Sequence, residues 1–352
     1  MRFGLFDWLD DTGRDVGETY QRRLEMVELA DKAGFYCYHV AEHHQTPLST
    51  LPSPNLFLAA ASQRTTRIRL ATLAYLLPFY QPLRLMEEIA MMDQLCQGRL
   101  EIGLSRGASQ FEMASYGISL EESRPRFEEA LDVILMGLST GRIDYRGKYF
   151  RYDNVETRLQ PVQRPYPPLW YPTSNVESIP WIAQQGFNTI FALHLAPNVE
   201  SVWDMLARYR QELHAHKGDA KRLNGHVAQP NYGFSMHVHV AQTDEQALKE
   251  ARASWQHFFE NFSYLWVKHG MGDRYRNRSD FDQLMSEGKF LIGSPAKVRD
   301  QLKRYSKVAN ANYFLGSFSW GSFTPEQILS SVDLFAQEVM PALQTAAAPA
   351  HS

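Results

Sequence analysis

The chain alternates short strand-type runs with longer helical patterns, and this alternation limits its possible folds more than any other feature. The strand-type runs are apolar, and most are followed by a stretch whose apolar residues recur at helical spacing. Strands that alternate with helices predict a parallel sheet whose faces are covered by those helices. The expected strands lie at residues 3–8, 35–41, 68–76, 100–104, 169–171, 189–193, 234–240 and 312–315.

About eight strand–helix units can be counted, which is the number in a closed (β/α)8 barrel, or TIM barrel. An open, doubly wound sheet is the alternative, but no Gly-x-Gly-x-x-Gly motif follows the first strand. We therefore expect an α/β TIM barrel with inserted loops. The expected helices lie at residues 18–33, 54–63, 82–96, 126–139, 199–216, 244–255, 296–308 and from 325 to about 340.

Two segments, residues 110–168 and 257–293, are longer than a barrel requires. Long segments between barrel elements are often functional loops. We expect one domain over residues 1–343 that contains both insertions. The last residues, 344–352, are expected to form a flexible tail.

Charge and cysteine content exclude several classes of protein. Lys and Arg number 36 against 39 Asp and Glu, and no basic stripe indicates a nucleic-acid partner. No stretch has the length of a membrane span, and no secretory signal is expected. The two cysteines, Cys37 and Cys96, are too few for a disulfide framework, which favours a reducing compartment. We expect a cytoplasmic protein.

The cluster Glu42, His43 and His44 directly follows the second expected strand, where a barrel places its active site. Adjacent strand residues face opposite ways, so only one of the two histidines points into a given pocket. That histidine suits an acid, a base or a hydrogen-bond donor near neutral pH. The alternative is that the three side chains only satisfy one another and nearby backbone. We favour a catalytic role because the cluster stands at a strand end.

A second candidate, Ser105-Arg106-Gly107, follows the fourth expected strand. An arginine beside a hydroxyl and a flexible glycine suits an anion such as a phosphate, with a salt bridge at the barrel rim as the alternative. Arg124 is a weaker phosphate candidate, because a surface ion pair explains it equally well.

A third candidate, Thr173-Ser174-Asn175, follows the fifth expected strand and precedes a helix. The tripeptide is typical of a helix N-cap. Because the free N–H groups of a helix start also bind phosphate, capping and phosphate binding are compatible here.

Two further patterns have mainly structural interpretations. His237 and His239 lie on one face of an expected strand, as in some metal sites, but the nearest carboxylates belong to a helix-capping segment. We therefore favour packing or substrate contact and expect no metal. An aromatic run in the second insertion is either core or dimer interface, which we favour, or a lid over an apolar substrate. Its members are Trp255, Phe258, Phe259, Phe262, Tyr264, Leu265 and Trp266.

From about residue 2 to residue 340, the chain resembles the bacterial-luciferase-like family of flavin-dependent monooxygenases and reductases. The matching motifs are short, but their order and spacing together are specific. They lie at residues 40–44 (Val-Ala-Glu-His-His), 70–78 with Pro82 beyond, 93–95, 98–99, 103–107 (Gly-Leu-Ser-Arg-Gly), 161–165, 167–168, 240–245 and 293–295.

The resemblance implies a TIM barrel that binds reduced FMN at the C-terminal ends of its strands. It identifies His43 as the functional histidine near the flavin, with Glu42 beside it. The bond between Leu73 and Ala74 matches a position that is often a non-proline cis peptide under the flavin ring.

The resemblance also implies that Arg106, Thr173 and Ser174 hold the FMN phosphate, with Arg124 as a helper. Ser105 stands where the light-emitting members carry a cysteine. This departure weakens the expectation of light emission but not that of monooxygenation.

The implied reaction is that of FMNH2 with O2, through a flavin C4a-peroxide that oxygenates a small, apolar organic substrate. A separate flavin reductase would supply the FMNH2, and a homodimer is expected. The alternatives are a deazaflavin-dependent dehydrogenase on the same fold, a non-catalytic flavin-binding protein, and a metal hydrolase that uses His237 and His239.

Overall fold

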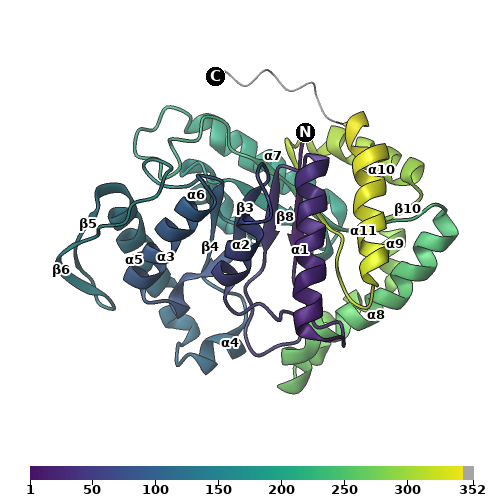
Figure 1. Ribbon diagram of the computed structural model, residues 1–352, viewed down its shortest axis with the longest axis horizontal. Coiled ribbons are helices and arrows are strands. Elements are labelled where there is room, and N and C mark those ends of the chain that lie inside the picture. The colour runs from purple at the N-terminus through teal and green to yellow at the C-terminus, as the bar shows by residue number, and fades with distance from the viewer. Residues whose placement is uncertain (344–352) are drawn as a thin grey trace.

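The computed structural model describes residues 1–343, apart from the side chains of residues 276 and 277. The tail expected at residues 344–352 lies outside the described residues. Figure 1 shows strands at the centre of the molecule with helices around them.

Within residues 1–343, eight parallel strands form a closed ring. The pairing runs from β1 through β2, β3 and β4 to β7, then from β8 through β9 and β11 back to β1. An isolated bridge between Trp170 and Asn188 joins β7 to the start of β8 and closes the ring. The expected (β/α)8 barrel is therefore confirmed. The strands are β1 (Arg2–Asp7), β2 (Cys37–Val40), β3 (Arg69–Leu76), β4 (Leu100–Ser105), β7 (Leu169–Trp170), β8 (Thr189–Ala192), β9 (Tyr232–Val240) and β11 (Tyr313–Ser317).

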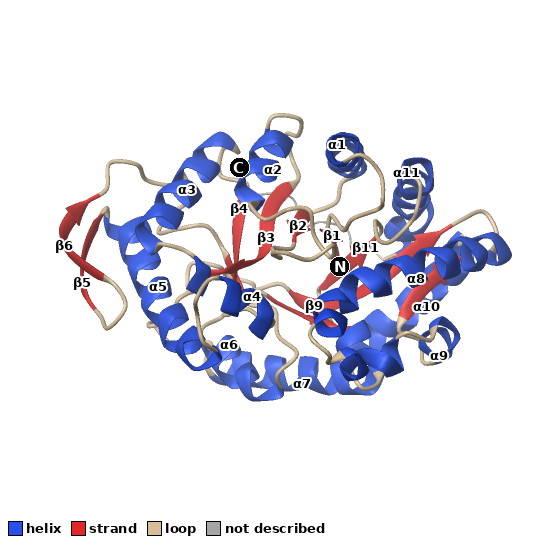
Figure 2. Ribbon diagram, turned by 90° about the horizontal axis from the view of Figure 1, so that it is seen from below, coloured by secondary structure: helices blue, strands red, loops and turns tan. Residues whose placement is uncertain are grey.

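A ring of helices surrounds the barrel (Figure 2). The first of them begins where the Asp15 side chain accepts the Glu18 N–H at 2.9 Å and ends at Gly34, which has a left-handed φ of 84°. No described helix is long and apolar enough to cross a membrane. The surrounding helices are α1 (Val16–Ala33), α2 (Pro54–Ser62), α3 (Pro82–Leu95), α5 (Leu120–Thr140), α6 (Ile179–Gln184), α7 (Val199–Ala215), α8 (Asp244–Lys268), α10 (Pro295–Ala309) and α11 (Pro325–Leu334).

Two helices differ in length from the prediction. Helix α5 begins at Leu120 rather than at residue 126, because Ser119 and Glu122 form a capping box and Pro125 is accommodated in the first turns of the helix. Helix α8 runs on to Lys268 instead of ending at residue 255. The aromatic run keeps helical spacing, so the second expected insertion begins inside a helix.

Both insertions contain regular structure that the sequence did not predict. The first carries the short helix α4 (Gln110–Ser115) and an antiparallel hairpin, β5 (Arg142–Arg146) and β6 (Arg151–Glu156), that projects from the barrel (Figure 1). The second carries α9 (Phe281–Ser286) and a buried strand, β10 (Phe290–Gly293). Strand β10 pairs with the C-terminal half of β9, beyond the part that pairs with β8.

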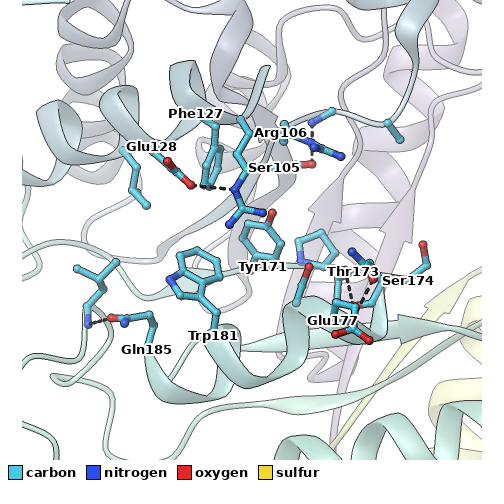
Figure 3. A pocket seen from close by; sticks show the side chains of 18 of the residues that line it. Ser105, Arg106, Phe127, Glu128, Tyr171, Thr173, Ser174, Glu177, Trp181 and Gln185 are labelled. Carbon is cyan, nitrogen blue, oxygen red and sulfur yellow. Dashed lines mark hydrogen bonds and ion pairs between the residues drawn. The ribbon is translucent and has the colours of Figure 1, made fainter. Parts of the chain in front are cut away.

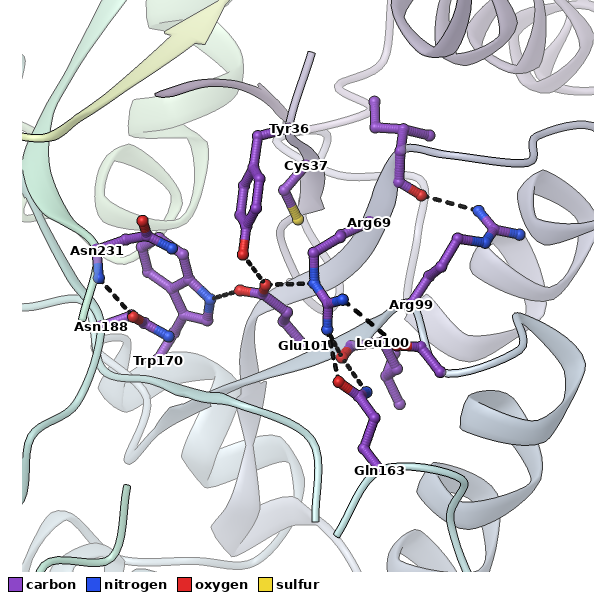
Figure 4. Close-up of polar contacts among 12 residues, drawn as sticks. Tyr36, Cys37, Arg69, Arg99, Leu100, Glu101, Gln163, Trp170, Asn188 and Asn231 are labelled. Carbon is purple, nitrogen blue, oxygen red and sulfur yellow. Dashed lines mark hydrogen bonds and ion pairs between the residues drawn. The ribbon is translucent and has the colours of Figure 1, made fainter. Parts of the chain in front are cut away.

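The N-terminal half of the barrel interior is filled by polar contacts around Glu101 of β4 (Figure 4). Its carboxylate accepts hydrogen bonds from Tyr36 Oη at 2.6 Å, Arg69 Nε at 2.5 Å and the Trp170 indole N–H. Arg69 also donates to Gln163 Oε1 at 2.7 Å. These contacts occupy the N-terminal end of the barrel interior and leave the C-terminal ends of the strands for a ligand.

Candidate active site

Two adjoining cavities lie at the C-terminal ends of the barrel strands. The first, which we call the apolar cavity, has a volume of about 280 Å³. It is lined by Phe6, Trp8, Ala41, Glu42, His43, Leu48, Leu73, Ala74, Leu76, Ser105, Ala108, Glu112, Pro172, Thr173, Ser174, Ile190, Ala192, His194, Leu195, Ser235, Phe262, Tyr275 and Leu315.

The second, which we call the polar cavity, has a volume of about 740 Å³ and lies beside α5 and α6 (Figure 3). Ser105, Ala108, Pro172, Thr173 and Ser174 line both cavities, so the two meet at the ends of β4 and β7. The remaining lining residues are Arg106, Gly107, Arg124, Phe127, Glu128, Leu131, Asp132, Tyr171, Asn175, Glu177, Ser178, Trp181, Gln185, Lys221 and Leu223.

His43 and His44 face opposite ways after β2, as the strand alternation predicts. His43 lines the apolar cavity, where its ring stacks on Trp8 with centroids 5.7 Å apart. The buried His44 turns away from the cavity, and its Nε2 lies 2.9 Å from Glu42 Oε1. On the other side of that ring, Nδ1 lies 2.8 Å from the hydroxyl of Tyr116. Of these two histidines, His43 is therefore the one placed to meet a ligand in the apolar cavity.

Glu42 is buried, and both of its carboxylate oxygens have partners. Oε1 lies against His44, and Oε2 accepts the Leu76 N–H at 3.2 Å and the Tyr80 hydroxyl at 2.9 Å. Burial raises the pKa of Glu42, against the lowering effect of these contacts. The carboxylate thus joins the end of β2 to the end of β3.

Glu112 of α4 belongs to the site although the sequence did not single it out. Its Oε1 accepts the His44 N–H at 2.7 Å and lies 3.2 Å from His43 Nδ1. Burial alone would raise the pKa of Glu112, but His43 and the His44 N–H outweigh that effect and lower it. The pattern Ser109-x-x-Glu112 was the available signal, and it predicts a capping box. The Ser109 side chain does accept the Glu112 N–H at 3.3 Å, whereas the glutamate side chain reaches His43 instead.

The peptide bond between Leu73 and Ala74 is cis, as expected, and both residues line the apolar cavity. Strand β4 passes close behind it, because a Cβ on Gly103 would lie 2.1 Å from the Thr72 carbonyl oxygen. Only a glycine fits at residue 103 with this spacing of β3 and β4.

Arg106 is half-buried in the wall of the polar cavity and forms no ion pair or hydrogen bond with any residue that the structure describes. Ser105 lies beside it, with its hydroxyl accepting the Gly107 N–H at 3.0 Å. A cation without a partner in a polar cavity fits an anionic ligand group. The salt bridge considered as the alternative for Arg106 is not found among the described residues.

Thr173 and Ser174 face the same cavity (Figure 3). Thr173 Oγ1 accepts the Asn175 N–H at 3.0 Å, and the Asn175 side chain in turn accepts the Glu177 N–H at 3.1 Å. Asn175 therefore caps the short turn before α6, as the N-cap interpretation predicted. The two hydroxyls line the same cavity as Arg106 and are suited to the same anion.

Arg124 also lines the polar cavity, but it forms the surface ion pair that was weighed as its alternative. Its Nε lies 3.0 Å from Glu128 Oε1, and its side chain is 72% exposed. Its two terminal nitrogens have no hydrogen-bond partner among the described residues, so Arg124 can still assist an anion in this cavity while Nε stays on Glu128.

His194, at the end of β8, lines the apolar cavity and was missed in the sequence. Burial and the nearby charges of Arg278 and Lys289 lower its pKa to about 3, so the ring is neutral. It lies edge-on to Trp8 with centroids 6.2 Å apart. A single histidine after an expected strand, with no motif around it, did not identify His194 as a site residue.

His237 and His239 line neither cavity and pack against other side chains. His237 is buried among aromatic rings, with Phe258 at 4.7 Å and Trp255 at 5.3 Å between centroids. His239 Nε2 lies 2.7 Å from Glu250. These contacts support the packing interpretation. No group of three metal-binding side chains was found among the described residues, which leaves the metal-hydrolase alternative without a ligand set.

The aromatic run divides between the core and the wall of the apolar cavity, while its roles as a lid or a dimer interface stay predictions. Trp255 and Phe258 are buried in the core, which confirms the packing interpretation for them. Phe262 lines the apolar cavity and packs on Tyr275, with centroids 5.0 Å apart. Trp266 packs on α4. The helix thus provides both core and cavity wall.

Residues 1–310 match the family model described as luciferase-like monooxygenase. An uncharacterized protein, y4wF, from Sinorhizobium fredii is 33% identical over 97% of this chain and 96% of its own length. The oxygenase component of the flavin-dependent trigonelline monooxygenase from Acinetobacter baylyi is 27% identical over 97% of this chain and 95% of its own length.

Solved structures share the fold across the whole chain. The monooxygenase RslO1 from Streptomyces bottropensis superposes with a TM-score of 0.82 at 26% identity, covering 97% of this chain and 99% of RslO1. The oxygenating constituent of 3,6-diketocamphane monooxygenase from Pseudomonas putida, in complex with FMN, gives 0.81 at 20% identity, covering 98% and 99%. A coenzyme F420-dependent reductase from Methanopyrus kandleri gives 0.71 at 15% identity, covering 97% and 99%.

Proposed function

Because this chain belongs to the luciferase-like monooxygenase family, we propose that it is an FMNH2-dependent monooxygenase that uses O2 to oxygenate a small, apolar organic substrate. The observation that carries this proposal is the joining of the two cavities. A polar cavity with an unpaired Arg106 opens into an apolar cavity with His43 and the Leu73–Ala74 bond. This arrangement suits a cofactor with a phosphate at one end and a flat ring at the other.

Arg106, Thr173 and Ser174 would hold the phosphate of FMN, because they offer a cation and two hydroxyls in the polar cavity. Leu73, Ala74 and Ser105 would contact the flavin ring where the cavities meet. When bound, reduced FMN would supply two electrons and the position at which O2 is activated. A separate reductase would supply the FMNH2, as the name "oxygenase component" of the trigonelline enzyme implies for that relative.

The chain's own residues would keep the reaction dry and manage its protons. Apolar side chains make up most of the wall around His43, which excludes bulk water. His43 would exchange a proton with the reacting group, because it faces this cavity. The catalytic role expected for Glu42 stays a prediction, and its contacts favour a supporting role at the rim. The homodimer and the cytoplasmic location also stay predictions.

A deazaflavin-dependent dehydrogenase is the second candidate. The polar cavity, at about 740 Å³, has room for a longer cofactor tail than a single phosphate. However, the acids of its lining (Glu128, Asp132 and Glu177) are as many as its cations (Arg106, Arg124 and Lys221), so the cavity offers an extended anionic tail no excess of positive charge. We therefore rank FMN first.

Titration of the purified protein with oxidised FMN, reduced FMN and a deazaflavin cofactor tests the proposal. We expect FMN to bind in the low-micromolar range or more weakly, with reduced FMN preferred. Binding of neither form of FMN would refute the proposal.

Stopped-flow mixing of the FMNH2 complex with O2, followed by flavin absorbance and by product analysis with candidate substrates, then separates the remaining alternatives. A monooxygenase incorporates oxygen from O2 into the product. A dehydrogenase acts without O2, and a binding protein forms no product.

A further inference from the structure

We propose that Glu112 of α4 is the positioning residue that fixes the ring state of His43. In this arrangement His43 Nδ1 carries the proton and donates a hydrogen bond to Glu112, while Nε2 presents a lone pair to the apolar cavity. The catalytic consequence rests on the proposed function, whereas the ring state itself does not.

The contacts of one carboxylate oxygen lead to this assignment. Glu112 Oε1 lies 3.2 Å from His43 Nδ1 and also accepts the His44 backbone N–H at 2.7 Å. An ionised carboxylate can only accept hydrogen bonds, so the ring nitrogen that faces it must be the donor. A neutral imidazole carries one N–H, which leaves Nε2 as the acceptor. The His43 side chain is 24% exposed, and it lines the cavity.

The charge of Glu112 is maintained in its buried position. The side chain is only 3% exposed, and burial by itself would raise its pKa. The hydrogen bonds from His43 Nδ1 and from the His44 N–H favour the ionised form and lower the pKa instead, which makes Glu112 the acceptor that this assignment requires.

Helix α4 is held in place from its other side, which keeps Glu112 against His43. Phe111 stacks on His269 with ring centroids 4.2 Å apart and meets the edge of Trp266 at 5.1 Å. Both partners lie at the C-terminal end of α8. The short helix α4 therefore connects the C-terminal end of α8 to His43 in the wall of the apolar cavity.

The ring state decides what His43 can do. Neutral histidine in water carries its proton mainly on Nε2, and that form would aim a donor into the cavity. With Nδ1–H bound to Glu112, Nε2 can take a proton from a group in the cavity. The resulting imidazolium is balanced by the carboxylate, and the same proton can return to an oxygen atom later in the cycle.

Nitrogen-15 NMR of histidine side chains in the cofactor-free protein at pH 8 tests the assignment directly. We expect His43 to be the Nδ1–H form in the wild type and in Glu112→Gln, because the glutamine carbonyl still accepts from Nδ1 and from the His44 N–H. Glu112→Ala should revert His43 toward the Nε2–H form. Glu121→Gln, an exposed acid on α5, is the matched control and should leave the spectrum unchanged. An Nε2–H form in the wild type, or an unchanged form in Glu112→Ala, overturns the proposal.

Turnover provides the second readout. We expect Glu112→Ala to lower kcat by roughly 10- to 100-fold while FMN affinity stays the same, with Glu112→Gln intermediate because it keeps the geometry but loses the charge. If Glu112→Ala fails to fold, the turnover of Glu112→Gln is the deciding measurement. Full wild-type turnover in that variant excludes a role for the negative charge of Glu112 in catalysis. If the wild type itself neither binds FMN nor turns over, the proposed function fails while the NMR result still stands.

Discussion

The ring of Trp8 stacks on the ring of His43, with centroids 5.7 Å apart and an angle of 24° between the planes. This contact joins the end of β1 to the end of β2 at the mouth of the barrel. In this stacked position the Nδ1 edge of the His43 ring lies against Glu112, and the remainder of the ring faces the apolar cavity. The geometry of this one side chain is therefore set by three segments of the chain.

Replacement of His43 by alanine should lower turnover by about 100-fold or more, because a positioned acid–base group contributes on that order. Binding of FMN should persist, since Arg106, the charged contact proposed for the phosphate, lines the polar cavity and not the apolar one. Product formation and FMN titration measure the two effects separately. His214→Ala, at an exposed position on α7, is the control. Turnover in His43→Ala equal to that of the control would remove His43 from the mechanism.

Replacement of Arg106 by alanine should weaken FMN binding by roughly 10- to 100-fold, because a charge-assisted hydrogen bond contributes about 1.5–3 kcal/mol. Affinity for riboflavin, which lacks the phosphate, should change little. Calorimetric titration with both ligands measures the difference. Arg158→Ala, an exposed arginine outside the polar cavity, should bind FMN like the wild type. An equal loss of affinity for both ligands would argue against a phosphate contact.

The buried Asp10 should make the free energy of unfolding depend on pH. Burial raises its pKa to about 7, although Arg23 and the Gly321 N–H oppose this. Its Oδ2 accepts the Gly321 N–H at 2.8 Å, and its Oδ1 has no hydrogen-bond partner among the described residues. The folded state therefore binds a proton that the unfolded state, with an ordinary pKa near 3.9, does not bind at neutral pH. The contribution of Asp10 is thus unfavourable above pH 7 and is relieved as the pH falls through 7.

From pH 8 to pH 6 this relief amounts to about 1.4 kcal/mol in favour of the folded state. Buried histidines such as His39 and His194, whose pKa values are lowered to about 3, act in the opposite direction below pH 6.5. The histidines are the same in the wild type and in Asp10→Asn, a variant that keeps an acceptor for the Gly321 N–H. The difference in pH dependence between the two proteins therefore reports Asp10 alone. Urea unfolding at both pH values measures the difference, and parallel pH dependence in the two proteins would contradict the prediction.

The ion pair at the closed end of the barrel should be important for stability. Removal of Glu101 by alanine substitution leaves Arg69, whose side chain is 21% exposed, without its carboxylate partner. The expected loss in the free energy of unfolding is about 3–5 kcal/mol, as for other buried pairs broken on one side. Asp153→Ala breaks the exposed pairs with Arg146 and Arg151 and should cost less than about 1 kcal/mol. Equal losses in the two variants would refute this difference.

Local patterns in the sequence predicted the order of the barrel elements and the opposite orientation of His43 and His44. These features depend on neighbours within a few residues, so periodicity and capping signals report them. The extra strand β10 and the true length of α8 were missed, because a four-residue apolar run and an aromatic run have no unambiguous period.

The sequence by itself thus determined the barrel, the strand ends that carry Glu42, His43 and Arg106, and, through resemblance, the cis bond at Leu73. Only the tertiary structure decided that Glu112 and His194 join the site and that His237 lies in the core. The reason is distance along the chain: His43 and Glu112 are 69 positions apart. No local period relates them, and they meet because closure of the barrel brings the ends of separate strands to one mouth.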